Sequence, residues 1–184
     1  MDEIDQMTER VAEERREGNT RIPSGCAICG YFSRSGRALP ATDAVDAMSY
    51  MHDRSNGLGG GFAGYGIYPD FPDHYAFHVF YDNDRAREET EAFLKVRFDI
   101  SNMERIPTRK VYGIKGAPLI WRYFGKLQPE IMAHTELDEE EYVCRSVIHI
   151  NTKIKGAYVF SSGKNMGVFK GVGYPEDVGE YYCL

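Results

Sequence analysis

The residues of this sequence with the most reactive side chains are its four cysteines, and two of them, Cys26 and Cys29, are separated by only two residues. Such a pair can be half of a zinc site, a redox-active dithiol or two small buried residues. Zinc needs a second pair of ligands at comparable spacing, but Cys144 and Cys183 are isolated and the five histidines form no tight pair. A redox dithiol normally lies at a helix N-terminus, whereas this pair lies in a strand-like run. The sequence therefore predicts no metal site, and two small buried residues are the simplest interpretation.

A second candidate is the glycine-rich stretch 59–66, which contains the pattern G-x-G-x-x-G. In a dinucleotide-binding fold this pattern follows a strand and opens a helix. Here it follows a predicted helix and runs into a predicted strand, so nucleotide binding is not expected. The glycines indicate a close approach of backbone to backbone or of backbone to a ligand. His78 and His149 fall at half-buried positions, and we expect both to be structural.

These candidates must be held in place by elements whose character changes along the chain. Residues 1–25 are highly charged, carry only a weak apolar stripe, and are predicted to form an extension outside the core. The apolar run at 26–32 predicts a buried strand. A helix should follow, with Thr42 as its N-cap and its end near residue 56.

The segment 72–155 has a β-α-β-α pattern that predicts a small α+β insertion, with a ferredoxin-like arrangement as one option. Its predicted elements are a strand at 75–81, a helix at 85–98, a strand at 106–112, a short helix at 118–124 and a helix at 138–155. The last helix has a capping pair, Asp138 and Glu141. We expect it to pack with Trp121 and the strand 75–81 in one core. A hairpin at 157–171 and the start of a further helix come after it.

Composition narrows the classes of function. The chain has 184 residues, with 22 Lys and Arg against 28 Asp and Glu, for a net charge of −6. No basic excess is present that would favour binding to nucleic acid. No apolar run approaches the roughly 18 residues of a membrane span, and the N-terminus is unlike a signal peptide. With so few cysteines, the cytoplasm is the expected compartment.

Several stretches taken together resemble a known family. The run C-A-I-C-G at 26–30 and the stretch M-H-D-R-S-N-G-L-G-G-G-F-A-G-Y-G at 51–66 resemble the start of class II glutamine amidotransferase domains, which are N-terminal-nucleophile hydrolases. With S-G-K-N-M-G-V-F-K-G-V-G at 162–173, the similarity is greatest to the stand-alone amidotransferase of archaeal and bacterial glutamate synthases. It extends over nearly the whole chain from Ile22. It implies an α+β fold: the N-terminal half of an αββα sandwich, formed by 26–71 and 156–184 and interrupted by the insertion at 72–155.

The resemblance also implies a chemistry. In this family the N-terminal cysteine, here Cys26, attacks the side-chain amide of glutamine, and its own α-amino group acts as the general base. A γ-glutamyl thioester forms, ammonia leaves and water releases glutamate. The amine is free only if residues 1–25 are removed as a propeptide. Arg54 is expected to order the region near the cysteine or to contact substrate, although a surface arginine at a helix end fits the pattern equally well. Cys29 is expected to be structural.

Three motifs of the family are not found in the chain: the glutamine-binding Arg-x-x-Thr-Asn, the oxyanion-hole Asn-Gly and the Thr-Asp-x-Glu acid. Asn56-Gly57 and Thr42-Asp43 lie in the wrong segments. We expect these motifs in a remaining C-terminal half of the domain, so the chain alone should have little activity.

The expected partners are glutamine, that C-terminal half and a glutamate-synthase-like subunit. FMN and iron–sulfur clusters are expected only in that subunit, and no cofactor in this chain. Two alternatives stay open. One is an amidotransferase for another ammonia acceptor, such as an amino sugar, a purine precursor or aspartate. The other is a non-catalytic binding or regulatory module with a degenerate site.

Overall fold

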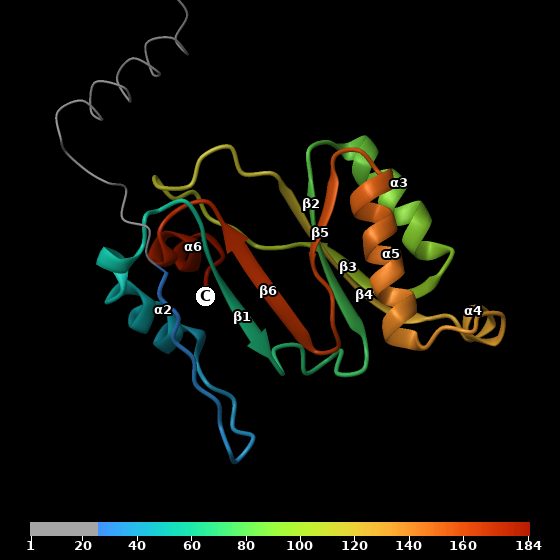
Figure 1. Cartoon of the computed structure of the whole chain (residues 1–184), viewed down its shortest axis with the longest axis horizontal. Coiled ribbons are helices and arrows are strands. Elements are labelled where there is room, and N and C mark those ends of the chain that lie inside the picture. The colour runs from blue at the N-terminus through green and yellow to red at the C-terminus, as the bar shows by residue number, and fades with distance from the viewer. Residues whose placement is uncertain (1–25) are drawn as a thin grey trace, which may run out of the picture.

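A computed structural model of the chain describes residues 26–184, which form two antiparallel sheets, one of four strands and one of two (Figure 1). The α+β class predicted from the sequence is therefore confirmed, and the predicted extension at 1–25 lies outside the described residues. In chain order the elements are α2 (Ala41–Ser49), the 3-10 turn η1 (His52–Arg54), β1 (Gly60–Tyr65), β2 (Tyr75–Tyr81), α3 (Asp84–Lys95), β3 (Phe98–Arg105), β4 (Leu119–Leu127), α4 (Pro129–Ala133), α5 (Glu139–Lys153), β5 (Ala157–Ser161), β6 (Met166–Gly171) and α6 (Pro175–Tyr181).

The four-stranded sheet has the strand order β3-β4-β2-β5, and each neighbouring pair is antiparallel. Its chain order, without the short α4, is β-α-β-β-α-β, which is the split arrangement of ferredoxin-like folds. α3 and α5 lie together on one face of this sheet (Figure 1). They bury a continuous core against it, which includes Leu94 of α3, Ile150 of α5 and Phe77 of β2. We call β2 to β5 with these helices the covered unit.

Local signals define the two long helices. Asn83 accepts a hydrogen bond from the Ala86 amide at 3.0 Å and so caps α3. Asp138 caps α5 in the same way, accepting from the Glu141 amide at 2.8 Å, as predicted. Trp121 packs against the cluster that contains the residues of β2 and α5, so the predicted shared core is confirmed as well.

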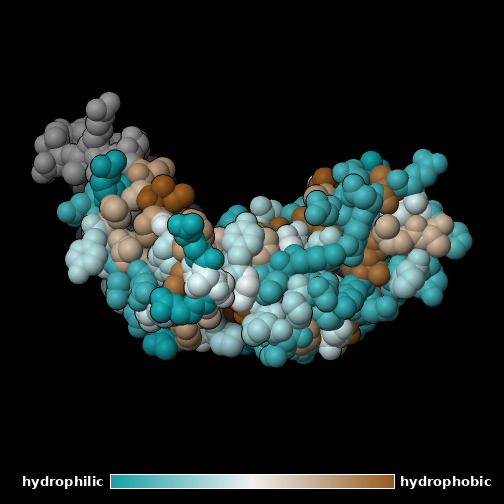
Figure 2. All heavy atoms as spheres, turned by 90° about the horizontal axis from the view of Figure 1, so that it is seen from below, coloured by the Kyte–Doolittle hydropathy of each residue, from teal (hydrophilic) through white to brown (hydrophobic). Residues whose placement is uncertain are grey.

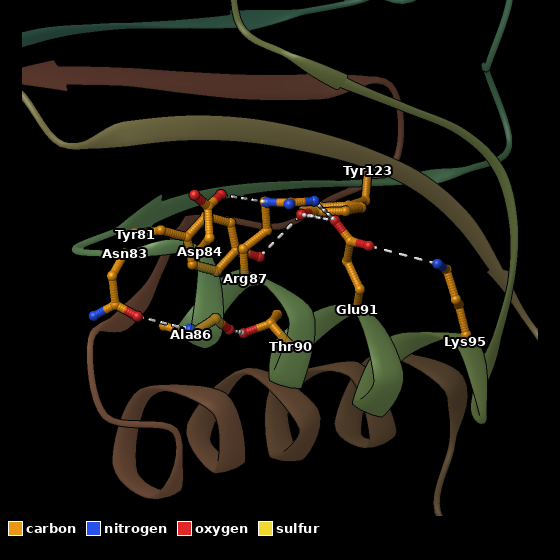
Figure 3. Close-up of polar contacts among 9 residues, drawn as sticks. All are labelled: Tyr81, Asn83, Asp84, Ala86, Arg87, Thr90, Glu91, Lys95 and Tyr123. Carbon is orange, nitrogen blue, oxygen red and sulfur yellow. Dashed lines mark hydrogen bonds and ion pairs between the residues drawn. The ribbon is translucent and has the colours of Figure 1, made fainter.

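Polar contacts also attach α3 to the sheet (Figure 3). Glu91 accepts hydrogen bonds from Arg87 Nη1 at 2.8 Å and from the Tyr123 hydroxyl at 3.2 Å. The hydroxyl of Tyr81 donates to that of Tyr123 at 3.1 Å. Burial raises the pKa of Tyr81 to about 12 and that of Tyr123 further, so both phenols stay protonated. The helix is therefore held by a satisfied network as well as by apolar packing.

The second sheet pairs β1 with β6, in a register that places Phe62 opposite Phe169. α6 packs on this sheet and α2 packs on α6, at the end of the molecule opposite α3 and α5 (Figure 1). A separate core cluster, which includes Phe160, Phe169 and Val178, lies under β6. The glycine-rich stretch is thus part of a strand and not a loop before one.

Two predictions within the insertion are wrong. The segment predicted as a helix at 118–124 lies almost wholly in strand β4. This strand is buried on both faces of the sheet, so its sequence lacks the two-residue alternation by which a strand is recognised. The strand predicted at 106–112 lies earlier, at Phe98–Arg105, and α3 ends at Lys95. Pro107 has no amide hydrogen to donate to a ladder, which ends the pairing there.

Three further predictions also need correction. The segments at 157–171 are strands but not a hairpin, because β5 pairs with β2 and β6 pairs with β1. Helix α2 begins at Ala41 after Pro40, so Thr42 is not its N-cap, and it ends at Ser49. Residues 26–32 form no strand, because no strand among residues 26–184 pairs with them.

Candidate functional site

Cys26, the predicted nucleophile, is exposed and its thiol is free. The segment that follows it runs without regular structure, and its apolar side chains face solvent: Ile28 is 93% exposed and Phe32 82%. Cys29 is half-buried and also free, so the structure does not bury this cysteine pair as two core residues. The first described residue of the chain therefore presents a thiol that solvent and small molecules can reach.

Arg54 lies at the end of η1 and is exposed. Within residues 26–184 no hydrogen bond or ion pair joins it to Cys26, so its suggested role stays a prediction. The neighbouring His52 fixes this turn: its ring stacks on Tyr174 with centroids 4.0 Å apart, and its Nδ1 pairs with Glu176. Gly57 has a positive φ of 69° and lies against the Tyr174 ring, where a Cβ would come within 3.1 Å.

Two of the three stretches on which the family resemblance depends lie side by side in the structure. The stretch 51–66 contains η1 and β1, and the stretch 162–173 contains β6. The six Cα partner pairs of the β1–β6 ladder join them directly. Residues about 100 positions apart in sequence thus form one structural unit, onto which residues 26–40 extend.

An apolar groove lies between residues 27–39 and the β1–β6 sheet, with a volume of about 1670 Å³. Its walls include Ile28 and Phe32 on one side and Tyr65, Val168 and Val172 on the other. Among residues 26–184, the charged side chains that line it are all cationic, namely Arg37, Lys115, Arg122 and Lys170. Figure 2 shows hydrophobic surface on the end of the molecule that carries α2, beside the hollow between the two ends. We call the space between residues 27–39 and the β1–β6 sheet the apolar groove.

A buried polar cluster lies where the two sheets meet, and two of its members, Tyr68 and Arg122, line the groove. His78, on β2, is fully buried, and its Nδ1 lies 2.9 Å from the Val168 carbonyl oxygen of β6. Because that oxygen can only accept, Nδ1 carries the hydrogen, and Nε2 accepts from the Tyr68 hydroxyl at 2.7 Å. Arg122 Nη1 donates to the same hydroxyl at 3.3 Å, and Arg122 also pairs with Glu104 at 2.6 Å. The cluster joins β2, β4 and β6.

The electrostatics of this cluster keep the imidazole neutral. Burial is the main cause that lowers the pKa of His78 to about 4, and the nearby Arg122 lowers it further, while the hydrogen bond to the Val168 carbonyl acts in the opposite direction. Burial also raises the pKa of Tyr68. Gly167 allows this close packing, since a Cβ there would come within 2.5 Å of His78 Cε1. His78 is therefore structural, as predicted, but wholly and not half buried.

His149 was expected at a half-buried position but is exposed on α5, where it stacks on Phe93 with ring centroids 4.5 Å apart. Across residues 26–184 no three His, Cys, Asp or Glu side chains gather in a way that could hold a metal ion. None of the helices in this same part of the chain is long and apolar enough to cross a membrane.

Comparison with known proteins gives one informative match. No family model matches the chain. An uncharacterized protein of Archaeoglobus fulgidus is 48% identical to it over 162 residues, which cover 86% of this chain. The same match covers only 42% of the relative, so the chain spans about two fifths of the length of that protein. The sequence of this chain is therefore similar to part of a longer archaeal protein.

Proposed function

We propose that the chain is the nucleophile-bearing part of a class II glutamine amidotransferase, and that its two-stranded sheet belongs to an N-terminal-nucleophile sandwich. The observation that carries the proposal is the β1–β6 ladder, which joins two of the stretches that resemble the family, 51–66 and 162–173. A chance resemblance of two unrelated segments has no reason to place them in one sheet. The exposure of the free Cys26 thiol gives further support.

The proposed reaction uses the thiol and the amine of one residue. The α-amino group of Cys26 accepts the thiol proton, directly or through water, and Sγ attacks the side-chain carbonyl carbon of glutamine. The C–N bond breaks, and the leaving nitrogen takes that proton and departs as ammonia. Water then cleaves the γ-glutamyl thioester, which releases glutamate and restores the thiol.

This chemistry needs groups beyond those on the chain. The oxyanion and the α-amino and α-carboxylate groups of glutamine require fixed partners, and loss of one oxyanion donor alone costs about 10²- to 10³-fold in rate. We assign these partners to the rest of the amidotransferase domain, and the use of the ammonia to a glutamate-synthase-like subunit. An amidotransferase that serves another acceptor would use the same Cys26 chemistry.

The test has two measurements on protein purified from its native host. Intact mass and N-terminal sequencing should show that the chain begins at Cys26, and ammonia release from glutamine should be lost in Cys26→Ala. Cys144→Ala is the matched control, because Cys144 is another exposed free cysteine, on α5. Full activity with residues 1–25 retained would refute the amine-base mechanism. Absence of glutaminase activity in a preparation that begins at Cys26 and also contains the remaining half of the domain would favour a non-catalytic binding module.

A further inference from the structure

The exposed apolar side chains of the molecule are unevenly placed. Among residues 26–184, thirteen large hydrophobic residues are exposed, and seven of them lie within residues 28–67. Single exposed hydrophobic residues are ordinary, but a contiguous patch indicates an interaction site. Several of these side chains share one feature, the apolar groove: Ile28, Tyr31, Phe32, Tyr65, Ile67 and Val172.

The groove is also lined by a strand, β1, that has one edge without a strand partner among residues 26–184. Among the described residues, β1 pairs only with β6, so its other edge has no strand partner. A two-stranded sheet is marginal by itself, and a free edge is a template for another strand. On one face of this sheet the β1 residues are Gly61, Ala63 and Tyr65, of which the first two are small enough to let another layer approach closely.

The segment 26–32 shows a conflict between local preference and observed structure. Its sequence is typical of a buried strand, yet it lies unpaired along the groove with Ile28 and Phe32 exposed. In natural proteins local preference and overall fold normally agree. The conflict is removed if another polypeptide pairs with this region and covers its side chains.

Two observations indicate what kind of polypeptide this is. The chain matches only 42% of its archaeal relative, so more than half of that protein lies outside the matched region. The charged side chains that the described part of the chain contributes to the groove are all cationic, although the chain has a net charge of −6. A second copy would bring the same cationic groove against itself, whereas an apolar segment flanked by acidic residues is complementary to it.

We infer that the apolar groove and the free edge of β1 bind an apolar, strand-forming polypeptide with acidic flanks, which the longer relative carries outside the matched region. Binding converts residues 27–32 from an exposed, irregular segment into a paired strand. The inference concerns this surface and stands whether or not Cys26 is a catalyst.

The experiment is co-expression of this chain with the part of the Archaeoglobus fulgidus protein that lies outside the match, followed by purification through a tag on one partner. We expect a 1:1 complex, with amide hydrogen exchange slowed at 27–32 and 60–65. Phe32→Asp should weaken the complex at least tenfold. Tyr158→Asp is its matched control, since it places the same charge at an exposed aromatic of β5 away from the groove. Both positions are exposed, so both variants should fold.

A charge test separates apolar from electrostatic recognition. Lys170→Glu should weaken the complex and reduce its dependence on salt, whereas Lys153→Glu on α5 should leave both unchanged.

Four results would overturn the inference. The first is that Phe32→Asp co-purifies with the partner as well as the native chain does, and the second is that no complex forms. The third is that amide exchange slows at the edge of β3 and not at β1. The fourth is that the chain self-associates with increasing concentration and that Phe32→Asp removes this association. Faster exchange in the groove on removal of residues 1–25 would assign it to the chain's own N-terminus and would also overturn it. A complex that forms normally but releases no ammonia from glutamine would contradict the proposed function and leave this inference intact.

Discussion

The two sheets of the molecule are covered to different degrees. The four-stranded sheet has two long helices on one face, and fourteen buried residues form one core cluster beneath them. The two-stranded sheet shares a cluster of eight buried residues with its surroundings, and it borders the apolar groove. A covered sheet with capped helices is a complete folding unit. A sheet with an open edge and an apolar groove is one part of an interface, and this is the region that contains the proposed nucleophile.

The largest expected effect comes from opening the covered unit. Ile150 is fully buried between α5 and the sheet, and Ile150→Asp places a charge in that core. We expect a loss of about 4 kcal/mol or more in the free energy of unfolding, enough to unfold the unit. Ile148→Asp on the same helix is the control, since Ile148 is exposed and the change should stay within about 0.5 kcal/mol. Thermal melts followed by circular dichroism would measure both, and an unchanged melt for Ile150→Asp would refute the packing.

The next effect concerns the junction between the two regions and depends on pH. The pKa of His78 is about 4 in the folded protein and near 6.5 when unfolded, so the unfolded state binds more protons between these values. The folded state should therefore lose stability as the pH falls from 7 towards 4, by up to about 3 kcal/mol from this group. Urea titrations at pH 7 and 5 would measure the loss.

The matched variants isolate this group from the other titrations. His78→Gln removes the titrating ring and should reduce the difference in stability between pH 7 and 5. His149→Gln removes an exposed imidazole on α5 and should not. An identical pH dependence in native protein and His78→Gln would show that the buried imidazole does not set it.

A smaller effect is expected where β6 passes close to β2. Gly167→Ala would place a Cβ within 2.5 Å of His78 Cε1 and 2.7 Å of the Tyr68 hydroxyl. Both rings are buried, so the strain should cost about 1–3 kcal/mol and should loosen the junction without unfolding the covered unit. Gly30→Ala is the control, because nothing lies within 4 Å of its new Cβ. Hydrogen exchange on β6 and on α5 would separate the two regions, and equal acceleration in both would contradict their independence.

The smallest effect sharpens the description of the covered unit. Glu91→Gln keeps the size of the side chain but removes the carboxylate that accepts from Arg87 and Tyr123 (Figure 3). We expect a loss of about 1 kcal/mol in the free energy of unfolding. Glu89→Gln should be neutral, because Glu89 lies two residues earlier in α3 and is exposed. If the two variants have the same midpoint in a urea titration, the network contributes nothing measurable beyond apolar packing.

Sequence patterns predicted the elements whose signals are local. The helix at 138–155 was located to within two residues because Asp138 caps it and Gly156 follows its end. The strand 75–81 was located from its run of aromatic and β-branched residues. The errors fall on segments whose secondary structure or sheet membership depends on which strands they pair with. β4 is buried on both faces and so has no alternation, and β5 and β6 are adjacent in sequence but belong to different sheets.

The candidate site was predictable only in part. The resemblance singled out Cys26 and the stretch 51–66 from their own residues. The cluster of Tyr68, His78 and Arg122 draws on a loop and two strands, and no local spacing relates these positions. The apolar groove likewise has walls from several distant segments. For such sites the only sequence signal is a polar residue within an apolar strand, as at His78.

The ladder between β1 and β6 has a consequence for the order in which the chain folds. Its innermost pair, Tyr65 and Met166, closes a loop of about 100 residues, which in a flexible chain costs about 4 kcal/mol of entropy. Once the covered unit has formed, however, its entry and exit are held together, since Tyr75 pairs with Lys164. The remaining loop is then about 10 residues long and costs about half as much. The covered unit should therefore form first and act as a template that lowers the entropic barrier to the sheet beside Cys26.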